Sequence, residues 1–132
     1  MSRRRNEACP AHWERVRLNE IATVQNGFPF PSSGFNREGG TPVIRIRDVG
    51  QADTETYFKG SFDPSFLVGE GDIVIGMDGE FRCRRWQGRP ALLNQRVCRL
   101  KLTTPEVDER YLLSLMQPYL DDVERVTSSI TV

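Results

Sequence analysis

The sequence predicts an α+β fold, as a single mixed domain with largely antiparallel strands, long ordered loops and a C-terminal helical segment. Three observations indicate this class. Apolar and polar residues alternate in the middle of the chain, which is typical of half-buried strands. Loops rich in Gly, Pro and Ser separate these stretches, and after Pro105 the apolar residues recur at helical spacing. The 132 residues are enough for one hydrophobic core.

The N-terminal part divides into a polar segment and the start of the domain. Residues 1–12 are expected to form a flexible tail, and the domain to occupy residues 13–132, beginning near Trp13. The segment "ERVRLNEIATVQNG" (14–27) combines a short strand-like piece with one helical turn, which Asn19 can cap. The residues expected to pack inward from this segment are Leu18, Ile21 and Ala22.

The first clear strand signal is "PVIRIRDVG" (42–50). Ile44 and Ile46 point to one face, whereas Arg45 and Arg47 point to the other, so a half-buried strand is expected. Long loops, 27–42 and 50–71, flank it, and aromatic residues predict that both are packed rather than floppy. The aromatic anchors of the second loop are Tyr57, Phe58, Phe62 and Phe66.

Two further strands and a helix follow. The apolar run from Ile73 to about Gly76 lies between glycines and predicts a buried strand. "ALLNQRVCRLKL" (91–102) resumes alternation, with Cys98, Leu100 and Leu102 facing the core and Arg99 and Lys101 facing out. Pro118 would kink or split the C-terminal helix. The apolar residues at helical spacing are Val107, Leu112, Leu115, Met116, Leu120 and Val123.

The composition excludes some classes of protein. Lys+Arg and Asp+Glu are both 18, so bulk charge predicts no polyanionic partner. Lys59 and Lys101 are the only lysines, and arginine suits recognition of phosphate or guanine edges, although a GC-rich genome gives the same bias. No apolar run is long enough to span a membrane and no secretion signal is evident. The odd number of cysteines fits free thiols in a cytoplasm.

Catalytic and metal signals are weak. The only histidine, His12, lies in the expected tail, so no catalytic triad is indicated, and no phosphate- or dinucleotide-binding glycine motif occurs. A zinc site from Cys9, His12, Cys83 and Cys98 lacks a second close-spaced ligand pair. Asp72, Asp78 and Glu80 can be either Mg²⁺ ligands of a nuclease or residues of glycine turns. We therefore expect no metal, no cofactor and no catalytic residue.

A basic segment, "GEFRCRRWQGRP" (79–90), carries four arginines around one tryptophan. In an extended chain Arg82, Arg84 and Trp86 share one face, which suits phosphates and base edges of a nucleic acid. The alternative is an arginine-rich solvent face with Trp86 packed in the core and Glu80 as an internal counter-ion. The residues alone do not decide between these interpretations. The arginines of the segment are Arg82, Arg84, Arg85 and Arg89.

The run "GDIVIGMDGEFRCRRWQGRPALLNQRVCRL" (71–100) resembles the target recognition domain of type I restriction–modification specificity subunits. The upstream order, with "LNEIATVQNG", the Phe/Pro/Ser loop and "TPVIRIRDV", also resembles this family, as does "DERYLLSLM" downstream. The resemblance covers roughly residues 13–126, and the central run is its specific part.

The resemblance implies a non-catalytic subunit in which each of two such domains reads one half of a bipartite DNA sequence. Long helices between the domains dock the methyltransferase and endonuclease subunits, which perform the chemistry. The expected partners are therefore double-stranded DNA, the modification methyltransferase subunit and the restriction endonuclease subunit, in a bacterial or archaeal cytoplasm. This chain has one recognition domain and stops at "SSITV", so we expect a truncation before the long spacer helix.

The resemblance also implies DNA-binding residues. The variable basic segment with Arg82, Arg84, Arg85, Trp86 and Arg89 is expected to read sequence. A second surface comes from the loop that carries Ser32, Ser33, Asn36 and Arg37. Phosphate contacts are expected from Arg45, Arg47 and Lys59. In the signature "LNQR", Asn94 and Gln95 are expected mainly to hold the fold, and Arg96 to contact DNA.

Two alternatives belong to other functional classes. A protein-interaction module of a restriction or defence complex would use the arginine face to dock an acidic protein surface. A small metal-dependent nuclease would use Asp72, Asp78 and Glu80.

Overall fold

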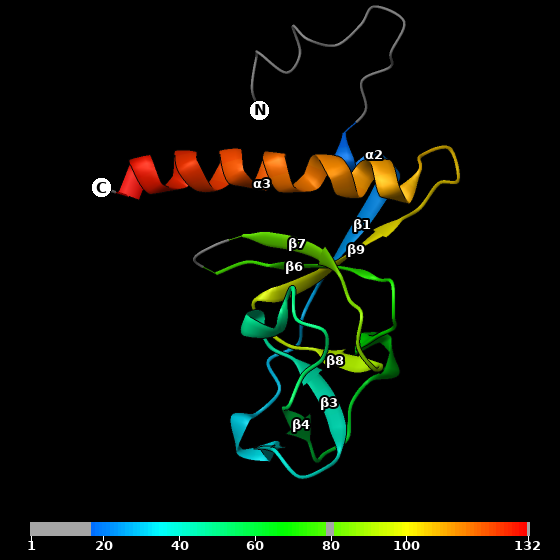
Figure 1. The fold of residues 1–132 in the computed structure, drawn as a ribbon, viewed down its shortest axis with the longest axis vertical. Helices are drawn as coiled ribbons and strands as arrows, with labels where there is room; N and C mark the ends of the chain where they lie inside the picture. Colours follow the sequence, from blue (N-terminus) through cyan, green and yellow to red (C-terminus); the bar gives the residue numbers. More distant parts are fainter. Residues whose placement is uncertain (1–16, 79–80, 132) are drawn as a thin grey trace, which may run out of the picture.

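The structure is a computed structural model that describes residues 17–78 and 81–131, with side chains described up to residue 125. Within these residues, helix α3 (Glu109–Thr131), a four-stranded sheet and a five-stranded sheet form successive layers (Figure 1). This arrangement confirms the expected α+β class with mostly antiparallel strands. The tail expected at residues 1–12 and the domain start near Trp13 lie outside the described residues.

The sheet beneath α3, here called the first sheet, has the strand order β1-β9-β6-β7, and every neighbouring pair is antiparallel. Its strand β6 coincides with the buried strand expected from the apolar run between glycines. Strand β7 is the edge of this sheet and carries the basic segment. The strands are β1 (Ala22–Asn26), β6 (Ile73–Gly76), β7 (Arg82–Arg85) and β9 (Val97–Leu102).

The second sheet has the order β2-β4-β3-β8-β5, and in it β3 and β8 pair in parallel while the other neighbours are antiparallel. Three of its strands, β2, β4 and β5, have two residues each and lie within the two expected loops. The aromatic anchors fix these loops: Phe58 is buried, and Phe62 and Phe66 pack at the edge of the same core. The strands are β2 (Phe35–Asn36), β3 (Thr41–Ile44), β4 (Tyr57–Phe58), β5 (Leu67–Val68) and β8 (Ala91–Leu93).

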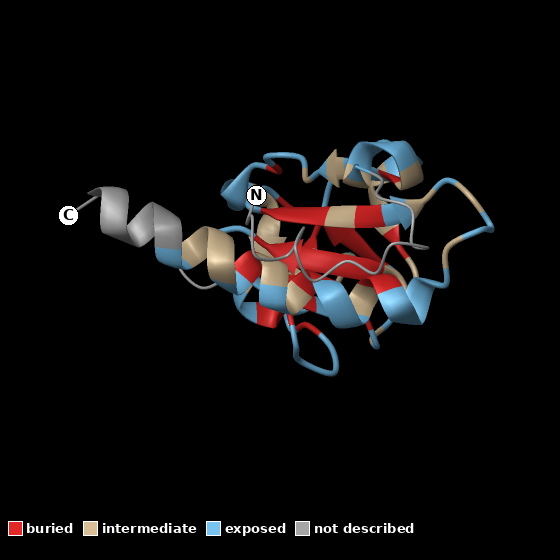
Figure 2. Cartoon of the chain, turned by 90° about the horizontal axis from the view of Figure 1, so that it is seen from above, coloured by how far each residue is buried: buried red, intermediate tan, exposed pale blue. Residues whose placement is uncertain are grey.

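The hydrophobic core follows the layers. One cluster joins α3 to the first sheet, with Ile75, Cys98 and Leu120 among its buried members. A second cluster fills the space between the sheets, with Val74, Trp86 and further apolar side chains. Figure 2 shows the buried residues in the sheet that α3 covers. Because each fully buried aliphatic side chain contributes about 1.5–3 kcal/mol, these two contacts hold the layers together.

The strand expected over residues 42–50 is shorter in the structure, because a 3-10 segment replaces its second half. Strand β3 ends at Ile44, and η2 (Ile46–Asp48) follows directly. Val43 and Ile44 are both fully buried, so the expected alternation of buried and exposed residues was wrong. The chain bends here because Asp48 accepts hydrogen bonds from the backbone of Arg45, at 2.8 Å, and from the Thr54 hydroxyl, at 3.0 Å. The other 3-10 segments are η1 (Ser32–Gly34) and η3 (Pro64–Phe66).

On strand β9, only one of the two side chains expected to face solvent does so. Lys101 is exposed as predicted, but the Arg99 side chain is only 11% exposed and does not face solvent. Its guanidinium donates to the Gln25 side chain, to the Asp72 carboxylate and to the carbonyls of Ser65 and Leu67. Arg99 therefore joins the first sheet to the loop that leads into β5.

The two helices are close to expectation. Helix α2 (Leu18–Ile21) is the expected turn, and Leu18, Ile21 and Ala22 pack into the core, but Arg17 rather than Asn19 precedes it as the N-cap. Helix α3 continues through Pro118 without splitting (Figure 1). No helix in the described part of the chain is long and apolar enough to cross a membrane.

Candidate functional site

The basic segment is divided between two environments. Arg82 and Arg84 on β7 lie opposite Gly76 and Val74 on β6. Both arginines therefore point to the side of the first sheet that faces η2. The burial pattern of β7 alternates, with Arg82 and Arg84 exposed and Cys83 buried beneath α3. The prediction that Arg82 and Arg84 share one face is confirmed.

Trp86 does not belong to the exposed part of that face. Its side chain is 1% exposed, packs between the two sheets and donates a hydrogen bond from Nε1 to the carbonyl of Arg89 at 2.7 Å. Strand β7 ends at Arg85, so the chain turns inward where the tryptophan begins. Trp86 therefore cannot stack on a ligand at this surface, and its place in the candidate binding set was wrong.

Arg85 and Arg89 are held by partners within the chain. Arg85 donates to the carbonyl of Gly71 and to the carboxylate of Glu109 on α3. Arg89 donates to Asp53 at 2.8 Å and to the Tyr57 hydroxyl at 3.0 Å. Burial raises the pKa of Asp53, but hydrogen bonds from the Thr54 amide and from Arg89 lower it more, so this pKa lies below its ordinary value of 3.8. These two arginines stabilise the fold, whether or not they also touch a ligand.

Residues around η2 complete one exposed face. A methyl group added at Gly76 would lie 3.2 Å from Ile46 Cγ1, and one added at Gly50 would lie 3.8 Å from Arg84 Cγ, so η2 packs against the hairpin of β6 and β7. Arg47 is exposed and forms no hydrogen bond or ion pair with any residue that the structure describes. Arg45 is half-buried, and its guanidinium lies 5.9 Å from the centre of the Phe35 ring.

The turn that carries "LNQR" lies at the end of the same hairpin. Val97 donates to the carbonyl of Asn94, and Arg96 has a left-handed φ of 69°. The Arg96 carbonyl accepts from the amide of Met77 at 2.8 Å, and the Arg96 guanidinium pairs with Asp78 at 2.7 Å. A non-glycine residue held in this conformation costs about 1–2 kcal/mol, so the turn is constrained by its surroundings.

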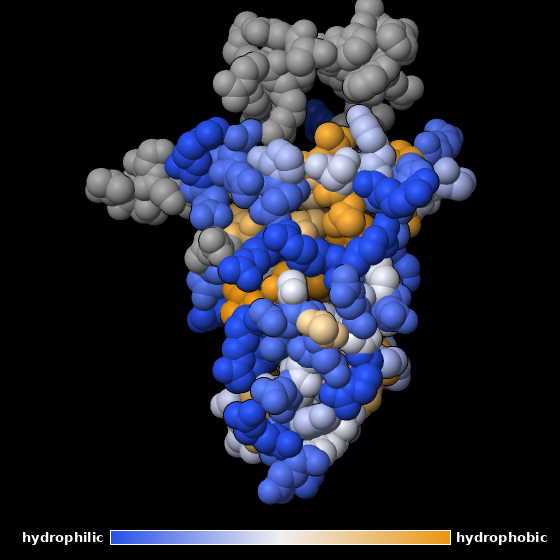
Figure 3. All heavy atoms as spheres, viewed as in Figure 1, coloured by the Kyte–Doolittle hydropathy of each residue, from blue (hydrophilic) through white to orange (hydrophobic). Residues whose placement is uncertain are grey.

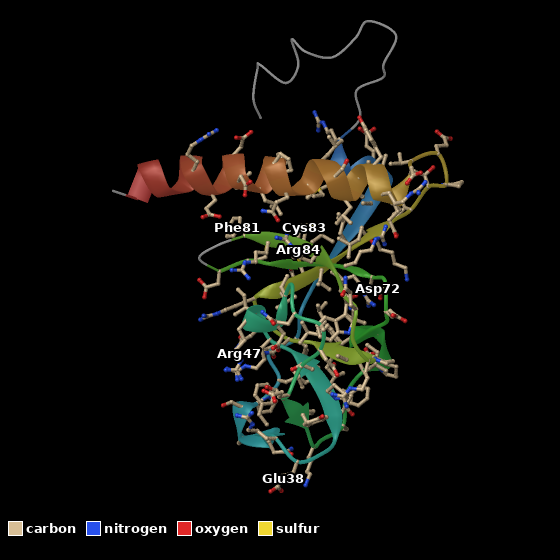
Figure 4. The ribbon with its side chains drawn as sticks, viewed as in Figure 1. Glu38, Arg47, Asp72, Phe81, Cys83 and Arg84 are labelled. Atoms are coloured by element: carbon tan, nitrogen blue, oxygen red, sulfur yellow. The ribbon has the colours of Figure 1, made fainter. Side chains whose placement is uncertain are left out.

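We define the hairpin face as the exposed side chains brought together by η2, the β6–β7 hairpin and this turn. Figure 4 shows Arg47 and Arg84 from two of these elements. Met77, directly after β6, is 44% exposed at the end of this hairpin and was not singled out from the sequence. The members of the hairpin face are Arg47, Met77, Asp78, Arg82, Arg84 and Arg96.

Close contacts of Gly27 with Asn94 and Val97 bring together two motifs, "QNG" and "LNQR", that lie far apart in the sequence. Asn94 is buried, which agrees with its expected role in the fold, whereas Gln95 is exposed. A methyl group at Gly27 would lie 1.7 Å from the Asn94 carbonyl oxygen, so only glycine fits there. The Gly27 amide also donates to Val97. The "QNG" and "LNQR" motifs thus form one packed unit beside the hairpin face.

The second expected surface lies along the same side of the molecule as η2 in Figure 1. Ser32 and Ser33 are exposed on η1. Lys59 is also exposed, and it lies beside η1 because its amide donates a hydrogen bond to the carbonyl of Gly34. Asn36 instead builds the loop, since its Oδ1 accepts from the amides of Glu38 and Gly39 at 2.8 Å each. Arg37 pairs with Glu55, and both side chains are more than three-quarters exposed. Figure 3 shows hydrophilic side chains over most of this view.

The geometry does not favour the alternative chemical sites. Asp72 and Asp78 lie at opposite ends of β6, which places their backbones about 20 Å apart, so they do not form the cluster that the nuclease alternative requires. Each pairs with an arginine, Arg99 and Arg96 respectively. Glu80 lies outside the described residues. No group of three or more metal-ligating side chains occurs in the part of the chain that the structure describes.

The cysteines do not offer a metal site either. Cys83 and Cys98 are free and buried in the core beneath α3. Burial raises the pKa of each thiol to about 11, so both are neutral at pH 7, whereas zinc binds thiolates. Cys9 and His12 lie outside the described residues.

Comparison with known proteins assigns the family. Residues 10–131 match the family described as the type I restriction modification DNA specificity domain. The chain therefore belongs to this family of DNA specificity domains. The family resemblance noted in the sequence is confirmed.

Relatives include two curated specificity subunits. The chain is 40% identical over 121 residues to the EcoBI specificity subunit of Escherichia coli, covering 91% of this chain and 26% of that protein. It is 27% identical over 121 residues to the MjaVIII specificity subunit of Methanocaldococcus jannaschii, covering 81% of this chain and 28% of that protein. The chain thus spans about a quarter of the length of these relatives.

Solved structures agree on the fold. The HsdS subunit from Thermoanaerobacter tengcongensis superposes with a TM-score of 0.66 at 21% identity, over 85% of this chain and 29% of that one. A structure from a study of complex assembly and conformational transition of the type I R-M system gives 0.68 at 22% identity, over 93% and 30%.

Proposed function

We propose that this chain is a DNA target recognition domain, spanning residues 13–132, that reads one half of a bipartite double-stranded DNA sequence. The observation that supports this most is the match to the DNA specificity family over residues 10–131. In this role the chain performs no chemistry and directs a modification methyltransferase subunit and a restriction endonuclease subunit to their target, in the cytoplasm of a bacterium or archaeon.

The hairpin face is the surface we assign to base contacts. Arg47, Arg82 and Arg84 extend from elements that pack against one another, so the relative positions of their backbones are fixed. Arginine bonds guanine through O6 and N7 with paired donors, and an apolar side chain such as Met77 can contact a thymine methyl group. Asp78 orients Arg96 and can accept from a cytosine amino group.

Phosphate contacts come from the flanking surface. Lys59, Ser32 and Ser33 lie on the exposed η1 side, where they can bind the DNA backbone without reading bases. Arg37 is paired with Glu55, but exposed pairs of this kind are weak and exchange readily for phosphate. Because every phosphate contact releases counter-ions, binding is expected to weaken steeply with salt.

Selection from a random double-stranded DNA pool at low salt tests this proposal, followed by anisotropy titrations of the enriched duplex and a scrambled duplex across a salt series. We expect one short motif to be enriched, and Arg84→Ala to lower the preference for it about tenfold. Lys59→Ala, the control, should weaken both duplexes alike.

Two outcomes would contradict the proposal. Binding of all duplexes with equal affinity would remove sequence reading from this chain. Failure to bind any duplex, with binding of an acidic protein surface instead, would favour the protein-interaction module.

A further inference from the structure

Strand β7 is an edge strand, yet it is not open. Neighbouring strands satisfy only one side of an edge strand, and the outer amides and carbonyls remain unpaired unless something covers them. Here α3 covers this side: the Phe81 amide donates to the Glu124 carboxylate at 3.0 Å and the Cys83 amide donates to Gln117 Oε1 at 2.8 Å. Figure 4 shows Phe81 and Cys83 directly beneath α3.

The Gln117 amide replaces a missing neighbouring strand. Its Oε1 accepts from Cys83, and its Nε2 donates to the carbonyl of Phe81 at 2.8 Å. One residue of an adjacent parallel strand would make the same two bonds, to the residues on either side of its partner, here Phe81 and Cys83 on either side of Arg82. The second Nε2 hydrogen is donated to Asp121 at 2.9 Å, which fixes the orientation of the amide.

The same amide also holds Arg84. Gln117 Oε1 accepts a second hydrogen bond, from Arg84 Nη1 at 2.9 Å, and this nitrogen donates to the Cys83 carbonyl as well. Both lone pairs and both hydrogens of the amide are therefore used. One nitrogen of the Arg84 guanidinium is anchored to the edge of β7, and the exposed side chain retains its other donors.

We propose that Gln117 is a positioning residue for DNA recognition, which acts by fixing both the edge of β7 and the guanidinium of Arg84 for contact with a base edge. This inference rests on the proposed function. Gln117 does not touch DNA itself, because it lies between α3 and β7.

Other side chains cannot do the same work. Glutamate accepts from Cys83 and Arg84 but cannot donate, so its carboxylate would face the carbonyl of Phe81 and the carboxylate of Asp121. Leucine has a similar size and makes none of the four bonds. Leucine should therefore release both Arg84 and the edge of β7, whereas glutamate should keep Arg84 and release only the bond to the Phe81 carbonyl.

The test measures the ratio of affinities for the enriched and scrambled duplexes in the intact chain with Gln117→Leu and with Gln117→Glu. Ser114→Ala is the matched control, because Ser114 lies one turn away on α3 and, among the described residues, bonds only the Tyr111 carbonyl. Circular dichroism and thermal unfolding establish that each variant is folded. If Gln117→Leu does not fold, Gln117→Met carries the test, because methionine favours a helix and makes none of the four bonds of the amide.

We expect the affinity ratio to fall about fivefold or more in Gln117→Leu, to fall less in Gln117→Glu, which keeps the contact with Arg84, and to stay unchanged in the control. In an Arg84→Ala background the Gln117 substitution should change the ratio less than about twofold, because the two residues act through one contact. A folded Gln117 variant with the wild-type ratio, or additive losses in the double variant, would overturn the inference alone. A wild-type chain without sequence preference would overturn the proposed function as well.

Discussion

The indole of Trp86 donates a hydrogen bond to the backbone carbonyl of Arg89 at 2.7 Å. This contact explains the shape of the basic segment. The buried indole draws the chain between the two sheets after β7, and the arginines before and after it separate: Arg84 stays at the edge beside α3, whereas Arg89 reaches Asp53 and Tyr57. The tryptophan thus organises a binding surface without belonging to it.

Truncation of Trp86 should therefore affect stability rather than sequence preference. Trp86→Ala removes a fully buried ring and should cost about 3–5 kcal/mol of unfolding free energy. Trp86→Phe loses the hydrogen bond and part of the volume and should cost about 2 kcal/mol, while the folded variant keeps the wild-type ratio of affinities for enriched and scrambled DNA. Urea denaturation and anisotropy measure the two quantities, and a lower ratio in folded Trp86→Phe would contradict this account.

Substitution of Arg96 by glycine should have the opposite effect to the Trp86 substitutions, because it should weaken DNA binding without lowering stability. Its φ of 69° favours glycine, so Arg96→Gly should leave the unfolding free energy unchanged or raise it by about 1 kcal/mol, although the ion pair with Asp78 is lost. Arg96→Ala keeps the strain and should not gain stability. Both variants should bind the enriched duplex more weakly, with a salt slope reduced by about 0.9 if Arg96 contacts one phosphate. Unchanged binding by Arg96→Gly would exclude Arg96 from the interface.

Arg99 should behave as a structural arginine. Its guanidinium bonds Gln25, Asp72 and backbone carbonyls around it. Arg99→Leu leaves these acceptors partly buried without donors, so we expect a loss of about 2–4 kcal/mol by urea denaturation. Arg99→Lys should recover little of it, because an ammonium group cannot reach acceptors on several sides at once. Full recovery by lysine would show that charge alone matters at this position.

The Asp53–Arg89 pair predicts an acid-dependent contribution to stability. The folded pKa of Asp53 is lowered below 3.8, so the pair contributes stability above this value and loses it as pH falls through the folded pKa. Asp53→Asn should therefore lower the melting temperature at pH 7 and have a smaller effect at pH 3. An equal effect at both pH values would show that the carboxylate charge is not involved.

Local signals in the sequence identified several elements correctly. The short apolar run between glycines gave β6, and strict alternation placed Arg82 and Arg84 on one face, because both features depend on a few neighbouring residues. The burial of Arg99 was missed for a different reason. The first sheet is covered on one side by α3 and on the other by the second sheet, so alternation no longer separates buried from exposed residues.

The candidate site depended more on tertiary contacts. The bend after Ile44, which places Arg47 beside the β6–β7 hairpin, comes from Asp48 and Thr54, and no periodic pattern reports such a contact. Likewise, the partners of Arg85 and Arg89 lie 24 and 36 residues away in sequence, so their engagement became evident only in the fold. Gln117 is a single residue whose importance arises from its position, and no sequence motif marked it.

The central claim is that the hairpin face contacts DNA, and the most direct test is an NMR titration of the isotope-labelled chain with the enriched duplex. The account predicts that signals of Arg47, Met77, Arg84 and Arg96 shift, while those of exposed residues elsewhere, such as Val24 on β1 and Tyr111 on α3, stay in place. Shifts confined to Val24 and Tyr111, with Arg47 and Arg84 unchanged, would contradict it and place the interface on another surface.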